Sequence, residues 1–159
     1  MLDRLSLFLF SFTSIAFIAV CFTILNKNYL LIKILFVINY AIFITSYVYT
    51  VLINPGIPKR DYYIKNFMNK KIDKDQWQNC LKCNILIPKH FKTVHCEDCD
   101  ICVLEEDHHC PWTGKCIGKY NLISFHIFVN SLCVYFIMIF ITFYSFIFYN
   151  SFFDRKKKK

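Results

Sequence analysis

The stretch EEDHHCPWTGKCIGKYN, residues 105–121, gathers side chains that bind metals or attack carbonyl carbons. Asp107, His108, His109 and Cys110 are consecutive, and Cys116 follows them closely. Imidazole nitrogens and thiolate sulfurs are the ligands that zinc prefers, and a thiolate beside an imidazole base is also a nucleophile. This stretch could therefore bind metal, carry out nucleophilic catalysis, or do both. Which residue has which role depends on how many other metal ligands the chain contains.

Upstream residues supply enough ligands for two zinc ions. Seven of the nine cysteines and four of the five histidines lie in the polar segment 54–121. Repeated C-x2-C spacing indicates metal sites, because one turn can present two sulfurs to a tetrahedral ion. Two such ions are satisfied by Cys80, Cys83, His95, Cys96, Cys99, Cys102, Cys116 and one of His108 and His109. Cys110 is then left over.

The spare thiol of Cys110 is either a buried structural residue or a nucleophile. His108, two positions away, can take the thiol proton, and Asp107 can fix the tautomer of that imidazole. This arrangement suits acyl transfer through a thioester. The ligand count does not decide which of the two histidines binds zinc, so both assignments stay open on the residues alone.

Three apolar stretches flank this polar segment, two before it and one after it. Residues 5–25 and 34–53 carry no charge, and residues 122–149 contain a single histidine and no formal charge. Each stretch has about the 20 residues needed to cross a hydrocarbon core, so we expect transmembrane spans at about 5–25, 30–53 and 122–149. A cleaved signal peptide is the alternative for the first, but its apolar run exceeds the roughly 7 to 15 residues usual there.

The boundaries of the remaining segments follow from composition. The first two spans form a hairpin over residues 5–53, which the sequence NPGIP ends, because proline removes a backbone donor. Residues 54–79 are a lysine-rich connector, 80–121 the cysteine-rich zinc domain, and 150–159 a basic tail. No internal repeat is recognised. The expected fold is an all-α multi-pass membrane protein with a small zinc-stabilised cytosolic cysteine-rich domain.

Composition and charge indicate which classes of binding partner to expect. The chain is 56% hydrophobic and 19% aromatic, which is too apolar for a soluble domain of 159 residues and indicates a lipid bilayer around it. The net charge of +8 owes half its value to four terminal lysines. Such an excess is typical of the flank of a membrane span, so we expect no nucleic acid among the partners.

The sequence resembles one family closely. DHHC at 107–110, the PW that follows, Cys116, the IG after it and Asn121, with the upstream cysteines and flanking spans, resemble the DHHC protein S-acyltransferases, or palmitoyltransferases. In that family the cysteine-rich domain faces the cytosol between the second and third of four spans. The resemblance implies that one zinc ion is held by Cys80, Cys83, His95 and Cys102. It implies that the other is held by Cys96, Cys99, His109 and Cys116.

The same resemblance implies the catalytic roles and the reaction. Cys110 becomes the nucleophile, His108 the base, and Asp107 the residue that orients the base. The expected function is protein S-palmitoyltransferase, moving a long acyl group from palmitoyl-CoA through an acyl-enzyme on Cys110 to membrane-proximal cysteines of protein substrates. The expected location is an endomembrane (Golgi or ER) or the plasma membrane. Lys115 and Lys119 are candidates to meet the phosphates of coenzyme A as point charges.

The departures from the family pattern carry expectations of their own. Asn54 stands where the family has aspartate, and Lys115 stands where it often has asparagine before the last ligand. The fourth span and the Thr-Thr-x-Glu motif are missing, and three spans would leave the RKKKK end on the lumenal side, against the positive-inside tendency. We therefore expect a truncated chain, and the alternative function is a catalytically impaired zinc-binding membrane adaptor.

Overall fold

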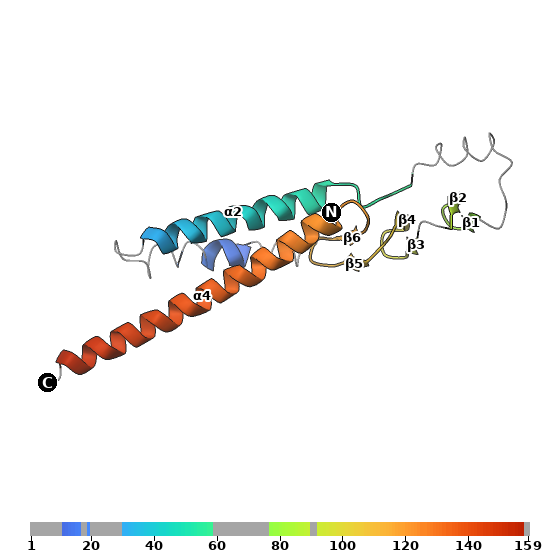
Figure 1. The fold of residues 1–159 in the computed structure, drawn as a ribbon. Helices are drawn as coiled ribbons and strands as arrows, with labels where there is room; N and C mark the ends of the chain where they lie inside the picture. Colours follow the sequence, from blue (N-terminus) through green and yellow to red (C-terminus); the bar gives the residue numbers. More distant parts are fainter. Residues whose placement is uncertain (1–10, 17–18, 20–29, 59–76, 90–91, 158–159) are drawn as a thin grey trace.

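The computed structural model describes residues 11–16, 19, 30–58, 77–89 and 92–157. Two long helices, α2 (Leu30–Leu52) and α4 (Leu122–Lys157), lie together, and a series of β-hairpins extends from the end where α2 finishes and α4 begins (Figure 1). Most of the expected first span, 5–25, lies outside the described residues. Its described parts, residues 11–16 and 19, are helical.

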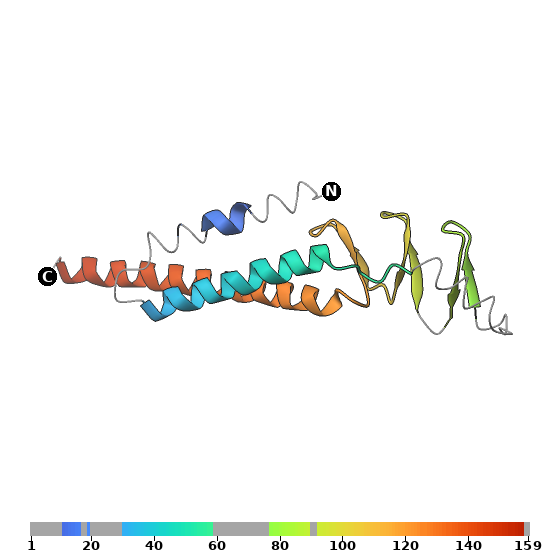
Figure 2. The same ribbon diagram turned by 90° about the horizontal axis from the view of Figure 1, so that it is seen from above.

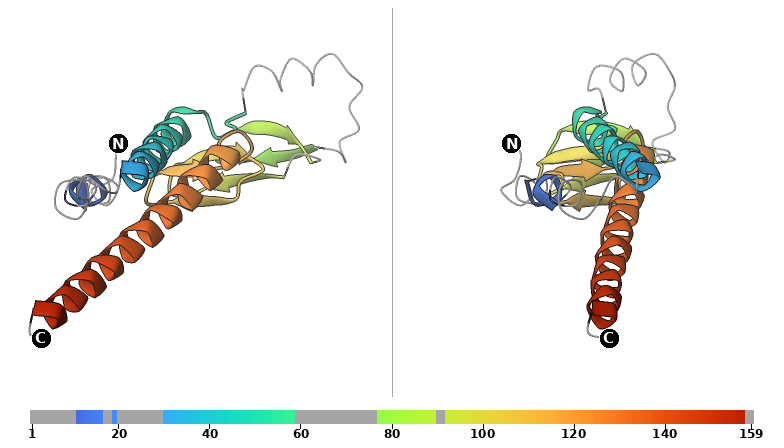
Figure 3. Two further views of the ribbon diagram at one scale, coloured as in Figure 1. Left: turned by 60° about the vertical axis from the view of Figure 1, so that its left-hand side comes forward. Right: turned by 90° about the vertical axis from the view of Figure 1, so that its left-hand side faces the viewer.

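Both long helices have the length and apolarity of membrane spans. Within the described residues, all of α2 and the stretch Leu122–Phe148 of α4 are long and apolar enough to cross a bilayer. Helix α4 continues to Lys157, past the expected end of the span at Tyr149, because no glycine or proline interrupts this part of the chain. In Figure 3, α4 therefore extends beyond the start of α2.

Aromatic side chains fill the interface between α2 and α4. Phe43 and Tyr47 of α2 pack against Phe128 of α4, with ring centroids 5.5 and 5.4 Å away. Further along, Phe36 meets Tyr135 edge-on at 6.2 Å. Spacings of seven and eleven residues on α2, and of seven residues on α4, place these rings on one stripe of each helix. The stripe fixes how α4 lies against α2 and therefore where the hairpin end of the pair is held.

The cysteine-rich segment is built from three antiparallel β-hairpins, which corrects the all-α expectation. They are β1 (Trp77–Cys80) with β2 (Ile85–Pro88), β3 (Thr93–Cys96) with β4 (Ile101–Leu104), and β5 (His108–Cys110) with β6 (Lys115–Ile117). Figure 2 shows them one after another, with β5 and β6 nearest the helices. Strands suit this segment because successive side chains point to opposite faces, so adjacent ligands can serve different sites.

A tight turn after α2 anchors the hairpins to the helices. The Asn54 side-chain oxygen accepts hydrogen bonds from the backbone N–H groups of Gly56 (2.9 Å) and Ile57 (2.7 Å), which an aspartate could also do. The Gly56 carbonyl then accepts a hydrogen bond from Leu104 N–H at 2.9 Å. Gly56 has φ +121°, a conformation that favours glycine. The end of α2 is thus bonded to the middle hairpin.

Candidate functional site

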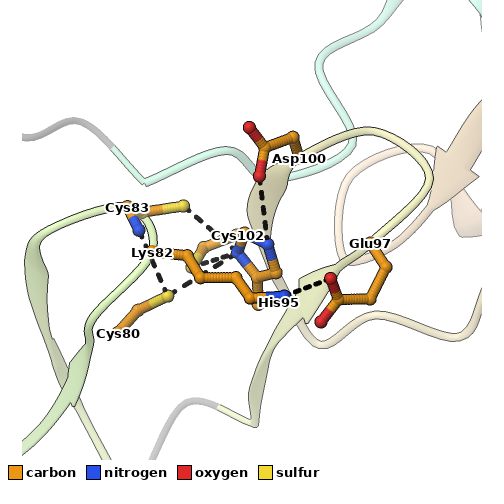
Figure 4. A network of polar contacts seen from close by, with 7 residues as sticks. All are labelled: Cys80, Lys82, Cys83, His95, Glu97, Asp100 and Cys102. Carbon is orange, nitrogen blue, oxygen red and sulfur yellow. Dashed lines mark hydrogen bonds and ion pairs between the residues drawn. The ribbon is translucent and has the colours of Figure 1, made fainter.

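The first ligand cluster joins the outer and middle hairpins. Cys80 ends β1 and Cys83 lies in the following turn, while His95 and Cys102 face each other across β3 and β4. The His95 Nδ1 atom lies 3.6, 3.3 and 3.9 Å from the sulfurs of Cys80, Cys83 and Cys102 (Figure 4). Its other ring nitrogen, Nε2, is buried and lies 3.4 Å from Asp100 Oδ1, without a hydrogen bond among the described residues.

The second cluster joins the middle and inner hairpins in the same way. Cys96 ends β3 and Cys99 lies in the next turn, while His109 and Cys116 face each other across β5 and β6. His109 Nδ1 lies 3.7, 3.3 and 3.8 Å from the sulfurs of Cys96, Cys99 and Cys116. In each cluster, all four candidate ligand atoms lie within 4.8 Å of one another.

These separations fit a tetrahedral ion. Zinc bonded to sulfur at about 2.3 Å and to nitrogen at about 2.0 Å sets ligand sulfur and nitrogen about 3.5 Å apart. The sulfur ligands also suit a metal ion. Burial raises the pKa of the Cys102 and Cys116 thiols. A bound cation keeps such buried sulfurs in the thiolate form. Cys80 differs, since the backbone N–H of Cys83 lowers its pKa to about 7. Each cluster can hold one metal ion.

The three hairpins form an internal repeat, which sequence inspection did not recognise. Each metal cluster takes two cysteines from the turn of one hairpin and a cross-strand His and Cys from the next. The last residue of each turn has positive φ: Asn84 (+50°), Asp100 (+52°) and Gly114 (+61°). Asparagine, aspartate and glycine are the residues that tolerate this conformation. The sequence pattern that could have revealed the repeat is an asparagine, aspartate or glycine directly after each C-x2-C or C-x2-T motif.

Cys110 occupies a ligand position of the repeat for which no second thiol is present. It ends β5 as Cys96 ends β3, but Thr113 stands where Cys99 stands in the middle hairpin. Thr113 is buried, and its hydroxyl donates a hydrogen bond to the Cys110 carbonyl at 3.3 Å. The Cys110 side chain is only 2% exposed and belongs to neither cluster. The structure thus brings a free thiol beside the second cluster.

His108 shares a strand face with Cys110, while His109 faces the metal cluster. Residues two apart on a strand point the same way, so the His108 imidazole and the Cys110 thiol lie on the face opposite to His109. Asp107 Oδ2 lies 2.9 Å from His108 Nδ1, and the ring of Phe125 in α4 packs 5.1 Å from the imidazole. In the part of the chain that the structure describes, no hydrogen bond joins the Cys110 thiol to the His108 ring.

The two expected coenzyme A lysines have different partners in this structure. The Lys115 ammonium donates hydrogen bonds to the backbone carbonyls of Val51, at 2.6 Å, and Ile53. Lys119 pairs with Glu105 at 2.5 Å. Burial lowers the pKa of Lys115. Neither contact tests the expected role of these lysines toward phosphate.

Comparison with known proteins gives the family. The model of the DHHC palmitoyltransferase domain matches residues 73–159, more than half of the chain and all three ligand-bearing hairpins. The chain belongs to the DHHC palmitoyltransferase family. The residues of this DHHC domain that the match covers include both candidate metal clusters, Cys110 and helix α4.

Curated relatives carry palmitoyltransferase names. The DHHC chain is 44% identical to palmitoyltransferase ZDHHC9 of Homo sapiens over 78 residues, covering 48% of this chain and 20% of that protein. It is 37% identical over 106 residues to palmitoyltransferase akr1 of Schizosaccharomyces pombe, covering 63% of this chain and 16% of that protein. It is 49% identical over 53 residues to ZDHHC18-B of Danio rerio. The chain thus spans about a fifth or less of the relatives it matches.

Proposed function

We propose that this DHHC chain is a protein S-palmitoyltransferase in which Cys110 carries the acyl group between palmitoyl-CoA and a substrate cysteine. The observation that supports the proposal best is the position of this thiol. It lies in a metal-ligand position of the third hairpin, yet outside both four-residue clusters, on the same strand face as His108, whose ring contacts Asp107. A purely metal-binding module has no use for that arrangement.

The first step is attack by Cys110 on the thioester. Nδ1–H of His108 donates to the Asp107 carboxylate, so Nε2 is the nitrogen that accepts the thiol proton. The Cys110 sulfur bonds to the acyl carbon, the bond from that carbon to the coenzyme A sulfur breaks, and the proton passes from His108 to the departing coenzyme A thiolate. One thioester replaces another, so little net driving force is needed.

The second step repeats this exchange with a protein thiol. His108 takes the proton of the incoming cysteine, whose sulfur attacks the acyl carbon, and Cys110 leaves and recovers the proton. Asp107 stabilises the imidazolium that forms in each step. Hydrogen bonds between catalytic groups often tighten only when the substrate binds, so the separation of the Cys110 thiol from the His108 ring is compatible with these roles.

The remaining parts of the proposal concern metal and membrane. Zinc fits each cluster by ligand type and separation, and its part is structural: it closes hairpins that are too small to fold on an apolar core. We further propose that the DHHC chain crosses the membrane several times and that its hairpins face the cytosol, where thiolate ligands stay reduced. Contacts of Lys115 and Lys119 with coenzyme A phosphates stay a prediction.

The test is acyl-enzyme formation by the purified chain in nanodiscs. With labelled palmitoyl-CoA the protein should acquire a label that hydroxylamine removes, because a thioester is cleaved by that reagent. Cys110→Ser should acquire no label and still contain two zinc ions, and Cys133→Ser, which removes the exposed thiol of α4, is the matched control. Loss of zinc from Cys110→Ser would assign Cys110 to a metal site and contradict the proposal.

A catalytically impaired adaptor was the alternative expected from the sequence. Neither the family match nor the arrangement of Asp107, His108 and Cys110 favours it. The same labelling experiment separates the two functions, since an adaptor would bind two zinc ions and form no acyl-enzyme.

A further inference from the structure

Helix α2 ends without a cap from its own sequence. Its last turn contains no basic residue, and Pro55 three residues beyond it has no N–H to donate. The Asn54 side-chain oxygen accepts hydrogen bonds from the backbone N–H groups of Gly56 and Ile57, which fold the chain away from the helix. The last carbonyls of a helix need donors, and the helix dipole makes this end attractive for a cation.

The donors come from the hairpin that carries Cys110 and from the turn that joins this hairpin to α4. Lys115, the first residue of β6, reaches the carbonyls of Val51 and Ile53 with its ammonium group. Asn121, fully buried, donates to the Thr50 carbonyl at 3.4 Å and to the Cys116 carbonyl at 3.0 Å. The end of an apolar helix is therefore closed by side chains more than 60 residues away in the chain.

Lys115 differs from the residues at the equivalent position of the other two hairpins. In register, Lys115 pairs with Cys110, just as Ile101 pairs with Cys96 and Ile85 with Cys80. The two hairpins whose turns carry a C-x2-C pair have isoleucine at this place. Only the hairpin with the free thiol has a cation there, and among these three hairpins it is also the one that bonds to the end of α2 through this position.

We propose that Lys115 is a positioning residue: by closing the end of α2 it fixes Cys110, its cross-strand partner, at a set distance from the end of the apolar helices. This inference rests on the proposed acyl transfer. A long acyl chain held among the helices must present its thioester to the Cys110 sulfur, so the depth of the hairpin relative to α2 sets how well the two reacting atoms meet. Misplacement of reacting groups by about 1 Å can cost on the order of 100-fold in rate.

The experiment compares Lys115→Met, which keeps the stem and removes the charge, with Lys115→Arg, which restores donors. Lys82→Met is the matched control, because Lys82 also pairs with an acceptor of a neighbouring hairpin, Glu97, but lies in the turn between β1 and β2. Acyl-enzyme formation is measured with palmitoyl-CoA and with palmitoyl-pantetheine, a thioester that lacks every phosphate. Zinc content, alkylation of Cys110 by iodoacetamide, and amide exchange at residues 50–53 are measured on the same proteins.

For Lys115→Met we expect acylation to slow by about tenfold or more with both donors, within the range that misplacement allows. Zinc content and alkylation should be unchanged, amide exchange at the end of α2 should become faster, and Lys115→Arg should recover much of the rate. Lys82→Met should behave as the wild type does.

Other outcomes overturn the proposal in distinguishable ways. Slower acylation with palmitoyl-CoA alone would make Lys115 a coenzyme A contact. Lost zinc, or equally slowed alkylation and acylation, would make it a residue needed only for folding of the hairpin. Unchanged acylation and exchange would show that the contact with Val51 and Ile53 positions nothing. If the wild type forms no acyl-enzyme with either donor, the proposed function fails, while amide exchange still reports whether Lys115 holds the end of α2.

Discussion

His109 pairs with Cys116 across β5 and β6, in the register in which His95 pairs with Cys102 across β3 and β4. Each of these pairs gives two ligands to a cluster that the preceding turn completes. Strand alternation then turns the residue after each histidine to the other face. After His95 that residue is a metal ligand of the next cluster, and after His109 it is the free thiol of Cys110.

The two adjacent histidines should respond differently to removal. His108→Ala should slow acyl-enzyme formation by about 10² to 10⁴, the usual range for loss of a general base, with both zinc ions retained. His109→Ala should release one zinc and destabilise the inner hairpin, because structural zinc binding is folding free energy. Acylation kinetics and elemental analysis of the two variants check this. Equal loss of metal from both would contradict the division.

The spacing of the residues predicted which of them could be ligands but not how they divide, and the expected division came from the family resemblance alone. Spacing identified eight ligand positions and one spare thiol, yet an all-α expectation offered no reason to prefer His109 over His108 for zinc. In a strand, residues with the same side-chain direction recur every two positions, so the facing pair of His109 and Cys116 follows directly. Strands of three or four residues give too short a pattern to recognise from sequence.

Long-range contacts were beyond sequence inspection for a different reason. Helix α2 was visible as an apolar run, but its end is closed by Lys115 and Asn121 from distant segments. Nothing in the local sequence of either residue indicates a helix carbonyl as its partner. Their spacing along the chain carries no periodic signal, so only the folded arrangement reveals the contact.

Metal removal should unfold the hairpins and leave the helices. The chain should contain two zinc ions, and a strong chelator should abolish the β-structure of residues 77–117 while α2 and α4 persist. Burial raises the pKa of the Cys102 and Cys116 thiols, and zinc binds only the thiolate, so protons compete better as the pH falls and zinc retention should decrease on acidification. Elemental analysis after dialysis at a series of pH values measures this.

A single zinc, or disulfides in place of metal, would contradict that prediction. The control is dialysis at neutral pH without chelator, which should leave both ions bound.

Gly118 should not tolerate a side chain. A Cβ atom there would lie 2.6 Å from Val103 Cγ1 and 2.7 Å from the Pro55 carbonyl oxygen, both closer than real contacts allow. Val103 is fully buried and the Pro55 atom is backbone, so neither can move easily. Gly118→Ala should therefore lower the free energy of unfolding by about 1 to 3 kcal/mol, as overpacking does.

Thermal unfolding of the zinc-loaded protein in nanodiscs measures that change. Ile123→Ala, which shortens an exposed side chain in the first turn of α4, is the control and should be close to neutral. Wild-type stability in Gly118→Ala would mean that the loop before α4 does not pass tightly between Pro55 and Val103.

Thr113→Cys should convert the turn after Cys110 into a third metal-binding turn. Thr113 stands where Cys99 stands in the middle hairpin, and Gly114 already has the positive φ that follows the second cysteine there. The introduced thiol and Cys110 would then be spaced as a C-x2-C pair, which binds soft divalent ions.

Under reducing conditions the Thr113→Cys variant should take up one more Cd²⁺ than the wild type, which is measured as added thiolate-to-metal absorption. The bound ion should block acyl-enzyme formation until a mild chelator removes it. Thr113→Ser, which keeps a hydroxyl, should show neither effect. If the variant binds no additional ion, or is inhibited equally with and without metal, the third hairpin does not share the geometry of the other two, and the free state of Cys110 needs another explanation than the missing second thiol.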